Sequence, residues 1–72
     1  MYKENFPIRM RAKREEIGYT QAQVAAITGI SQSNIAKYEK GKLEPTLENL
    51  GIIAQFYNVN INWLLGVTLE KE

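Results

Sequence analysis

The pattern of apolar and polar positions over residues 20–42 predicts two short helices separated by a brief turn. The first helix covers residues 21–28 and the second covers residues 32–40. Small and apolar side chains recur at helical spacing on both sides of the turn, and these are Val24, Ala25, Ile30, Ile35 and Tyr38. Val24, Ile30 and Ile35 are spaced to fill the angle between the two helices, while Ala25 allows their close approach and Tyr38 follows Ile35 on the same buried face. The outward positions of the second helix are polar instead, and they hold Gln32, Ser33, Asn34 and Lys37.

Both helices have start and stop signals in the sequence. Thr20 precedes the first helix and Gln23 follows three residues later, which is the spacing of a capping box. Ser31 holds the N-cap position of the second helix. Gly29 and Gly41 follow the two helices, and glycine readily takes the positive φ with which many helices end. Two short helices joined by a tight turn that contains glycine are typical of a helix-turn-helix.

A longer helix is predicted before this pair, ending at residue 17 ahead of Gly18. Asn5 is its predicted N-cap, with Pro7 in the first turn, and the first five residues are expected to form a short arm. One stripe of this helix combines apolar side chains with a single arginine, because it contains Phe6, Met10, Arg14 and Ile17.

An arginine within an apolar stripe needs a partner, because an isolated buried charge is costly. Glu39, near the end of the second short helix, is the best candidate for the partner of Arg14. The alternative is that the Arg14 side chain reaches solvent as one more basic residue of its helix.

Two further helices are predicted after residue 42. Thr46 caps a helix over residues 47–57, and Asn60 caps a short helix that ends before Gly66, while Asn58 suits a left-handed helix end. The side chains expected in the core are Leu47, Leu50, Ile53, Ala54, Tyr57, Ile61 and Leu64. Four other apolar side chains either contact a second subunit or close a small core within the chain, and they are Ile52, Phe56, Trp63 and Leu65.

Composition restricts the class of protein. The 72 residues allow one small domain, expected at residues 1–66, with a loose tail at 67–72. The absence of cysteine and histidine excludes disulfides, thiolate metal sites, histidine catalysis and most zinc sites. The apolar runs are too short to span a bilayer, and the N-terminus lacks the apolar segment of a signal peptide. We therefore expect a cytoplasmic protein with no membrane partner and no cofactor.

The net charge of +1 is unevenly distributed along the chain. Residues 9–42 hold seven cationic side chains and three carboxylates, a formal charge of +4. The remaining residues hold two cationic side chains and five carboxylates, a formal charge of −3. A molecule polarised in this way can turn its basic half toward phosphates, although an ordinary solvated surface gives the same counts.

Taken together, these motifs resemble the Cro/CI-type (XRE-like) helix-turn-helix family of phage repressors and bacterial regulators. The resemblance extends over about residues 6–66. It is carried by Arg14, Gly18, Tyr19, Thr20, Gln21, Ala25, Gly29, Ser31, Ile35, Tyr38, Glu39, Gly41, Lys42, Pro45, Thr46, Leu47 and the run Asn62, Trp63, Leu64 and Leu65. It implies an all-α fold, a compact five-helix bundle of the lambda-repressor-like DNA-binding type. It also implies a transcriptional regulator, a repressor, that binds double-stranded DNA sequence-specifically. Within the fold, it implies an internal ion pair between Arg14 and Glu39.

The resemblance also implies roles for individual residues. The second short helix would enter the major groove, where base-reading side chains are Gln32, Ser33, Asn34 and Lys37. Contacts with the DNA backbone would come from Gln21, Ser31, Lys40 and Lys42. A homodimer on a palindromic operator is expected, with Ile52, Phe56, Trp63 and Leu65 as candidate dimer contacts. Two positions depart from the family pattern, because Thr28 replaces a usually apolar residue and Ser33 replaces longer reading side chains.

Two other classes of function are alternatives to DNA binding. The same fold could serve as a protein-interaction or antitoxin-like module with weak DNA binding, for which the apolar set of Ile52, Phe56, Trp63 and Leu65 is the motivation. An enzyme is a remote alternative, because the sequence shows no paired carboxylates, no nucleophile with a base and no phosphate-binding glycine loop. No small-molecule ligand is evident.

Overall fold

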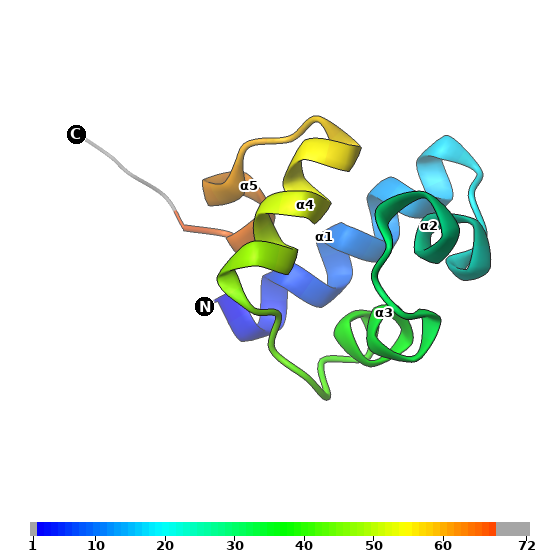
Figure 1. Cartoon of the computed structure of the whole chain (residues 1–72). Helices are drawn as coiled ribbons and strands as arrows, with labels where there is room; N and C mark the ends of the chain where they lie inside the picture. Colours follow the sequence, from blue (N-terminus) through cyan, green and yellow to red (C-terminus); the bar gives the residue numbers. More distant parts are fainter. Residues whose placement is uncertain (1, 68–72) are drawn as a thin grey trace.

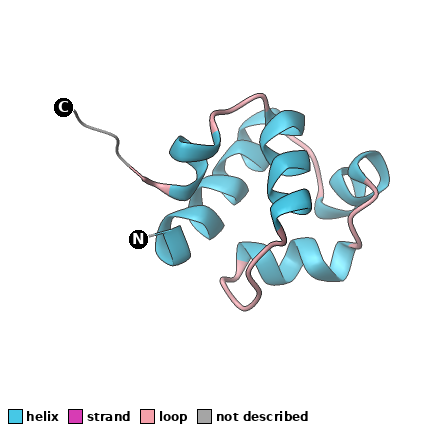
Figure 2. Cartoon of the chain, turned by 60° about the vertical axis from the view of Figure 1, so that its left-hand side comes forward, coloured by secondary structure: helices cyan, strands magenta, loops and turns pink. Residues whose placement is uncertain are grey.

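A computed structural model describes residues 2–67, with side chains from residue 4 onward, and within this range the chain forms five helices (Figure 1). They are α1 (Tyr2–Ile17), α2 (Gln21–Thr28), α3 (Gln32–Glu39), α4 (Leu47–Tyr57) and α5 (Ile61–Leu65). The described residues form no strand (Figure 2), so the predicted all-α, five-helix fold is confirmed. Apart from Val67, the tail expected at residues 67–72 lies outside the described residues. None of the five helices is long and apolar enough to cross a bilayer.

The longest helix, α1, organises the packing of the others. It contacts α3, α4 and α5, while α2 packs on α3 and α4 (Figure 1). α3 contacts both halves of α1, because the Tyr38 ring lies 6.1 Å from the Phe6 ring and Glu39 pairs with Arg14, while α5 contacts the N-terminal half of α1, where Trp63 meets Arg9. Every helix has a neighbour on which to bury an apolar face, which is how a domain of this size excludes water from its interior.

The predicted helix ends are mostly confirmed. The hydroxyl of Thr20 accepts the backbone N–H of Gln23, and the side chain of Gln23 accepts the backbone N–H of Thr20, which completes the capping box. Side chains at the N-caps of the next three helices accept first-turn N–H groups in the same way, and they belong to Ser31, Thr46 and Asn60. Positive φ occurs at every predicted helix end, namely Gly18, Gly29, Gly41, Asn58 and Gly66.

The predicted start of α1 is wrong. The helix begins at Tyr2, so the expected arm is helical from its second residue and Asn5 lies inside the helix. The Asn5 side chain instead lies against Gly66 at the end of α5, where an added Cβ would collide with its amide group. Pro7 also lies inside the helix, where it lacks an N–H to donate, and its side chain is buried against Gly41.

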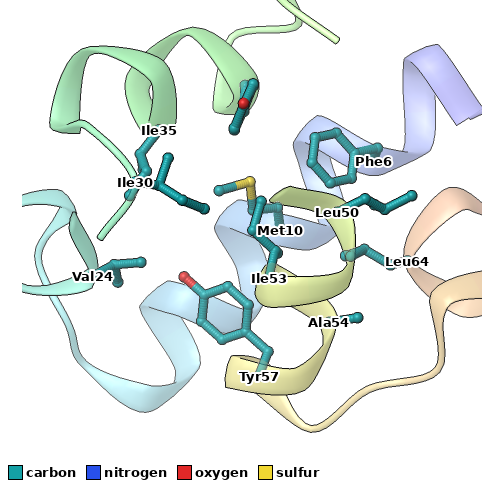
Figure 3. Packing of buried hydrophobic residues seen from close by; sticks show 11 residues of the cluster. Phe6, Met10, Val24, Ile30, Ile35, Leu50, Ile53, Ala54, Tyr57 and Leu64 are labelled. Carbon is teal, nitrogen blue, oxygen red and sulfur yellow. The ribbon is translucent and has the colours of Figure 1, made fainter. Parts of the chain in front are cut away.

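One apolar core runs through the molecule and draws on all five helices and the turn between α2 and α3 (Figure 3). Its members are Phe6, Met10, Val24, Ile30, Ile35, Tyr38, Leu50, Ile53, Ala54, Tyr57 and Leu64. Most of the residues expected in the core are therefore buried.

Three residues predicted to be in the core are exposed instead. The exposed fraction is 46% for Ile17, 87% for Leu47 and 41% for Ile61. Each is the first or last residue of its helix, as the bounds of α1, α4 and α5 show. At such a position the helical stripe continues beyond the neighbouring element, so the side chain meets solvent rather than the core.

Two tyrosines are almost fully buried, but their hydroxyl groups differ in hydrogen bonding. The hydroxyl of Tyr38 accepts the side-chain amide N–H of Asn49 at 2.9 Å, which links α3 to α4. The hydroxyl of Tyr57 has no hydrogen-bond partner among the described residues. Burial raises the pKa of Tyr57 to about 12 from its ordinary value of 10, because the ionised phenolate would lose its hydration.

This difference predicts opposite outcomes for two matched substitutions. Tyr38→Phe leaves the Asn49 amide without its acceptor and should lower the free energy of unfolding by about 1 kcal/mol. Tyr57→Phe removes a hydroxyl that forms no hydrogen bond, so stability should be kept within about 0.5 kcal/mol or increase. Urea denaturation at pH 7 measures both values. A loss above about 2 kcal/mol for Tyr57→Phe would show that its hydroxyl has a partner.

The raised pKa of Tyr57 also predicts a loss of stability at alkaline pH. Between pH 10 and about 12 the unfolded chain releases the Tyr57 proton while the folded chain retains it. The free energy of unfolding should therefore fall with rising pH in this window, by up to about 1.4 kcal/mol per pH unit from this group. The Tyr57→Phe variant, measured alongside the wild type, should lack this contribution.

Candidate nucleic-acid interface

The helices α2 and α3 are held together by apolar side chains in the angle between them. Val24, Ile30 and Ile35 are all buried there, as the sequence predicts. At the turn, the backbone N–H of Gly29 donates to the carbonyl oxygen of Ala25 at 2.9 Å, which closes the end of α2. The relative orientation of the two helices is therefore set by close packing rather than by a flexible linker.

Thr28 is well accommodated, although a polar residue at this position departs from the family pattern. Its hydroxyl donates to the carbonyl oxygen of Val24 at 2.7 Å and accepts the backbone N–H of Ile30 at 3.2 Å. Both bonds lie within the turn, so the hydroxyl joins α2 to the segment that enters α3. These two hydrogen bonds satisfy the hydroxyl of Thr28 at a position that is usually apolar in the family.

The outward face of α3 presents polar side chains that are free of internal partners in the described structure. Gln32, Ser33 and Lys37 are exposed, and Asn34 is half-buried. The Ser31 hydroxyl accepts the backbone N–H of Asn34 at 3.1 Å as the N-cap, and its own O–H remains able to donate. All four predicted base-reading residues therefore lie on one helix, within two turns of its N-terminus.

Cationic side chains of α1 are engaged within the fold. Arg11 pairs with Glu15 at 3.0 Å, and Lys13 pairs with Glu16 at 3.3 Å. The guanidinium of Arg9 lies 4.9 Å from the ring centroid of Trp63 and donates to the Trp63 carbonyl oxygen at the end of α5. The positive charge counted over α1 is therefore largely offset by its neighbours.

Three lysines near the end of α3 and in the loop after it are not compensated in this way. Lys37, Lys40 and Lys42 form no ion pair with a carboxylate in the part of the chain that the structure describes. Lys40 and Lys42 are exposed, and both follow Glu39, whose carboxylate is already occupied. Uncompensated positive charge is thus present on α3 and in the loop that directly follows it.

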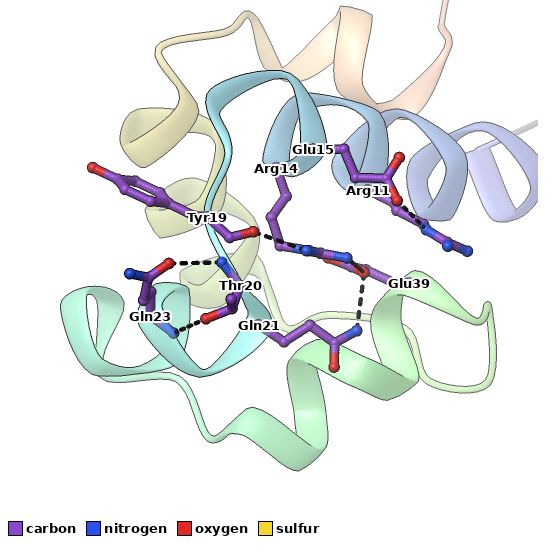
Figure 4. Close-up of polar contacts among 8 residues, drawn as sticks. All are labelled: Arg11, Arg14, Glu15, Tyr19, Thr20, Gln21, Gln23 and Glu39. Carbon is purple, nitrogen blue, oxygen red and sulfur yellow. Dashed lines mark hydrogen bonds and ion pairs between the residues drawn. The ribbon is translucent and has the colours of Figure 1, made fainter.

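A partly buried cluster of hydrogen bonds joins α1, α2 and α3 (Figure 4). The Arg14 guanidinium donates to both carboxylate oxygens of Glu39, through Nε at 2.8 Å and Nη2 at 3.0 Å. Its Nη1 donates to the carbonyl oxygen of Tyr19 at 2.9 Å, just before α2. The Gln21 amide Nε2 donates to Glu39 Oε1 at 3.0 Å.

This geometry decides between the two interpretations of Arg14. Its side chain is 14% exposed and that of Glu39 is 3% exposed, so the Arg14 side chain is directed inward and not to solvent. The hydrogen bond to Glu39 is the main cause of a raised Arg14 pKa. The Glu39 carboxylate accepts three hydrogen bonds, which compensates for its burial. The contact of Gln21 with Glu39 was missed from the sequence, because nothing in the spacing of residues 21 and 39 indicates it.

The candidate dimer contacts do not gather into one exposed apolar patch. Ile52, Phe56 and Leu65 are half-buried and pack against the core. The Phe56 ring stacks on Tyr19 with a centroid distance of 5.7 Å. Trp63 is 40% exposed beneath Arg9. The structure also exposes large apolar side chains outside this candidate set, among them Ile27, Ile61 and Val67.

Comparison with known proteins places this arrangement in a family. The family model described as Helix-turn-helix (HTH_3) matches residues 10–64, which include α2, α3 and α4 entirely. The chain belongs to the Cro/CI-type helix-turn-helix family. No solved structure matches the chain.

Several curated relatives within the Cro/CI-type family are similar to this chain. The cryptic phage CTXphi transcriptional repressor RstR of Vibrio cholerae is 43% identical over 58 residues, covering 81% of this chain and 52% of the relative. The transcriptional regulator ImmR of Bacillus subtilis is 33% identical over 58 residues, covering 81% of this chain and 46% of the relative. The transcriptional regulator DicA of Escherichia coli is 30% identical over 64 residues, covering 89% of this chain and 47% of the relative. The chain thus spans about half the length of these relatives.

The ion pair predicts a large asymmetry between two arginine substitutions on α1. Arg14→Met leaves the buried Glu39 carboxylate without its cation and should lower the free energy of unfolding by roughly 3–5 kcal/mol. Arg11→Met breaks only the exposed pair with Glu15, which should cost no more than about 0.5 kcal/mol. Urea denaturation followed by circular dichroism measures both losses.

The control for this prediction removes both buried charges together. A double variant with Arg14→Met and Glu39→Leu leaves no uncompensated charge and should recover most of the stability lost by Arg14→Met. Equal losses for Arg14→Met and Arg11→Met would contradict a buried role for the Arg14–Glu39 pair.

Proposed function

We propose that this protein binds double-stranded DNA sequence-specifically and regulates transcription, as a repressor, with α3 in the major groove. The observation that carries the proposal is the exposed polar face of α3 followed directly by uncompensated lysines, in a chain of the Cro/CI-type family. The relative RstR is named as a transcriptional repressor, which supports the direction of regulation. We expect the protein to act in the cytoplasm.

Base reading is assigned to the outward side chains of α3. The amide of Gln32 can form two hydrogen bonds with the N6 and N7 edge of adenine, and Lys37 can reach the O6 and N7 acceptors of guanine. Ser33 bonds several bases and discriminates weakly among them. Asn34 is half-buried, so its contribution is either a base contact at the edge of the groove or a backbone contact.

Contacts with the DNA backbone are assigned to residues that flank α3. Gln21 and Ser31 lie at the starts of α2 and α3, where first-turn N–H groups and the helix dipole favour a phosphate. Lys40 and Lys42 supply charge in the loop after α3. These contacts fix the register of the helix in the groove, while the side chains of α3 supply sequence preference.

Two copies are proposed to bind a palindromic operator, with recognition helices one DNA turn apart, roughly 34 Å. The candidate contact includes Trp63, and Ile61 and Val67 are further exposed apolar side chains in and just after α5. Ile52, Phe56 and Leu65 contribute only through their exposed edges, because each also packs on the core.

Selection from a random pool of duplex DNA at about physiological salt tests this function. A recovered inverted repeat is the expected result, and its half-site spacing would report the distance between two recognition helices. A single half-site would support DNA binding and reject the dimer.

Failure to enrich any sequence, with folding verified by circular dichroism, would overturn the proposal. The alternative would then be a protein-interaction module. One observation favours that alternative, namely a shallow cavity of about 200 Å³ between α2 and α4, lined by Ile27, Thr28, Ile52, Gln55 and Phe56.

Two substitutions should separate base reading from phosphate contact on the selected operator. Gln32→Ala should weaken operator binding by about 1–3 kcal/mol and relax preference at one base position. Lys42→Ala should weaken binding to operator and unrelated duplex alike. It should also reduce the slope of log K against log salt by about 0.9. Fluorescence anisotropy titrations at several salt concentrations measure both effects. A sequence-dependent loss for Lys42→Ala would contradict its assignment to the backbone.

A further inference from the structure

We propose that Glu39 is a positioning residue for DNA binding, which orients the side-chain amide of Gln21 toward the phosphate backbone. This inference rests on the proposed function, because Gln21 is assigned there to the DNA backbone. Glu39 itself is 3% exposed and does not reach the DNA. It acts through the hydrogen bond from Gln21 Nε2 to Glu39 Oε1, which is 3.0 Å long.

The chemistry of Glu39 leaves only one orientation for the Gln21 amide. An ionised carboxylate only accepts hydrogen bonds, so Gln21 must turn its NH₂ group and not its carbonyl oxygen toward Glu39. Figure 4 shows the Gln21 carbonyl oxygen directed away from the carboxylate. One of the two Nε2 hydrogens is used by Glu39, and the other remains to donate. A glutamine that lacks this contact would be free to present either end of its amide.

The position of Gln21 makes this orientation useful for an anion. Gln21 is the first residue of α2, directly after the N-cap Thr20. First-turn N–H groups lack intrahelical acceptors, and only that of Gln23 is taken by the Thr20 hydroxyl within the capping box. The remaining Nε2 hydrogen of Gln21 therefore adds a side-chain donor to backbone donors that already favour a phosphate.

Arg14 also holds in place the two segments of the chain that carry Glu39 and Gln21. Its guanidinium holds Glu39, the last residue of α3, and also the carbonyl oxygen of Tyr19, two residues before Gln21. One cation therefore fixes the end of the recognition helix and the approach to α2. The Gln21 amide is preorganised for binding, which avoids part of the entropy cost of ordering it on DNA.

A thermodynamic cycle tests the inference in two backgrounds. The first background is the wild type, and the second is the Arg14→Met, Glu39→Leu double variant, which lacks the acceptor for Gln21. Gln21→Ala is introduced into each, and operator affinity is measured where circular dichroism shows all four proteins folded. In the wild type, Gln21→Ala should weaken binding roughly two- to tenfold, the equivalent of one hydrogen bond. In the second background, the same substitution should have little effect.

Lys42→Ala is the matched control for this cycle. Lys42 has no contact with Glu39 or Arg14 in the described structure, so its substitution should weaken binding by the same factor in both backgrounds. Equal effects of Gln21→Ala in both backgrounds would overturn the positioning role, because a merely structural effect of Glu39 would leave the Gln21 contribution unchanged.

A measurement on the free protein separates this inference from the proposed function. Nitrogen-15 relaxation of the Gln21 side-chain amide should show a rigid NH₂ group in the wild type and a mobile one in the Arg14→Met, Glu39→Leu variant. A mobile Gln21 amide in the wild type would overturn the inference even if DNA binds. A rigid amide in a protein that binds no duplex would overturn the proposed function, and the role of Glu39 on DNA with it.

Discussion

The contact between Arg14 and Glu39 links three of the five helices at the edge of the apolar core that packs them together. Arg14 belongs to α1 and Glu39 to α3, and the same hydrogen-bonded cluster reaches Tyr19 and Gln21 at the entrance to α2. A buried ion pair adds little net stability compared with an apolar pair of similar volume, because both ions lose hydration. Its geometry is nevertheless exacting, since a two-pronged guanidinium accepts only a narrow range of carboxylate positions. The pair therefore restricts the arrangement of these helices more than it adds to the free energy of unfolding.

The features predicted best from the sequence are those with local causes. Thr20, Ser31 and Thr46 cap helices because a hydroxyl and a nearby N–H are close in the chain, so the neighbouring sequence contains the needed information. Ile17, Leu47 and Ile61 were misassigned because periodicity does not reveal where a neighbouring helix stops covering a stripe. Asn5 was misassigned because its position beside Gly66 depends on the far end of the chain.

The residues of the candidate site also fall into two groups, those whose placement has a local cause and those whose placement depends on distant parts of the chain. The outward placement of Gln32, Ser33 and Lys37 follows from helical geometry and was predicted correctly, although their contacts with DNA remain a proposal. The hydrogen bond between Gln21 and Glu39 was not foreseen, because it depends on how α2 and α3 approach each other in three dimensions. Counting charges over residues 9–42 gave the net charge but not its position. The count of +4 already subtracts Glu15, Glu16 and Glu39, which pair with Arg11, Lys13 and Arg14 in the structure, so the remaining charge belongs to Arg9, beside the Trp63 ring, and to Lys37, Lys40 and Lys42.

This local compensation has a consequence for how the protein would meet DNA. An even spread of positive charge would attract phosphates to α1 and α3 equally and would not select one orientation. With the cations of α1 engaged, the attraction is centred on the three lysines at and after the end of α3. The same helix carries the polar side chains assigned to base reading and ends in Glu39, which is fixed to Arg14. In the proposed complex, electrostatic approach, insertion into the groove and anchoring to the core would therefore all depend on one short helix. A change in its orientation would alter phosphate and base contacts together.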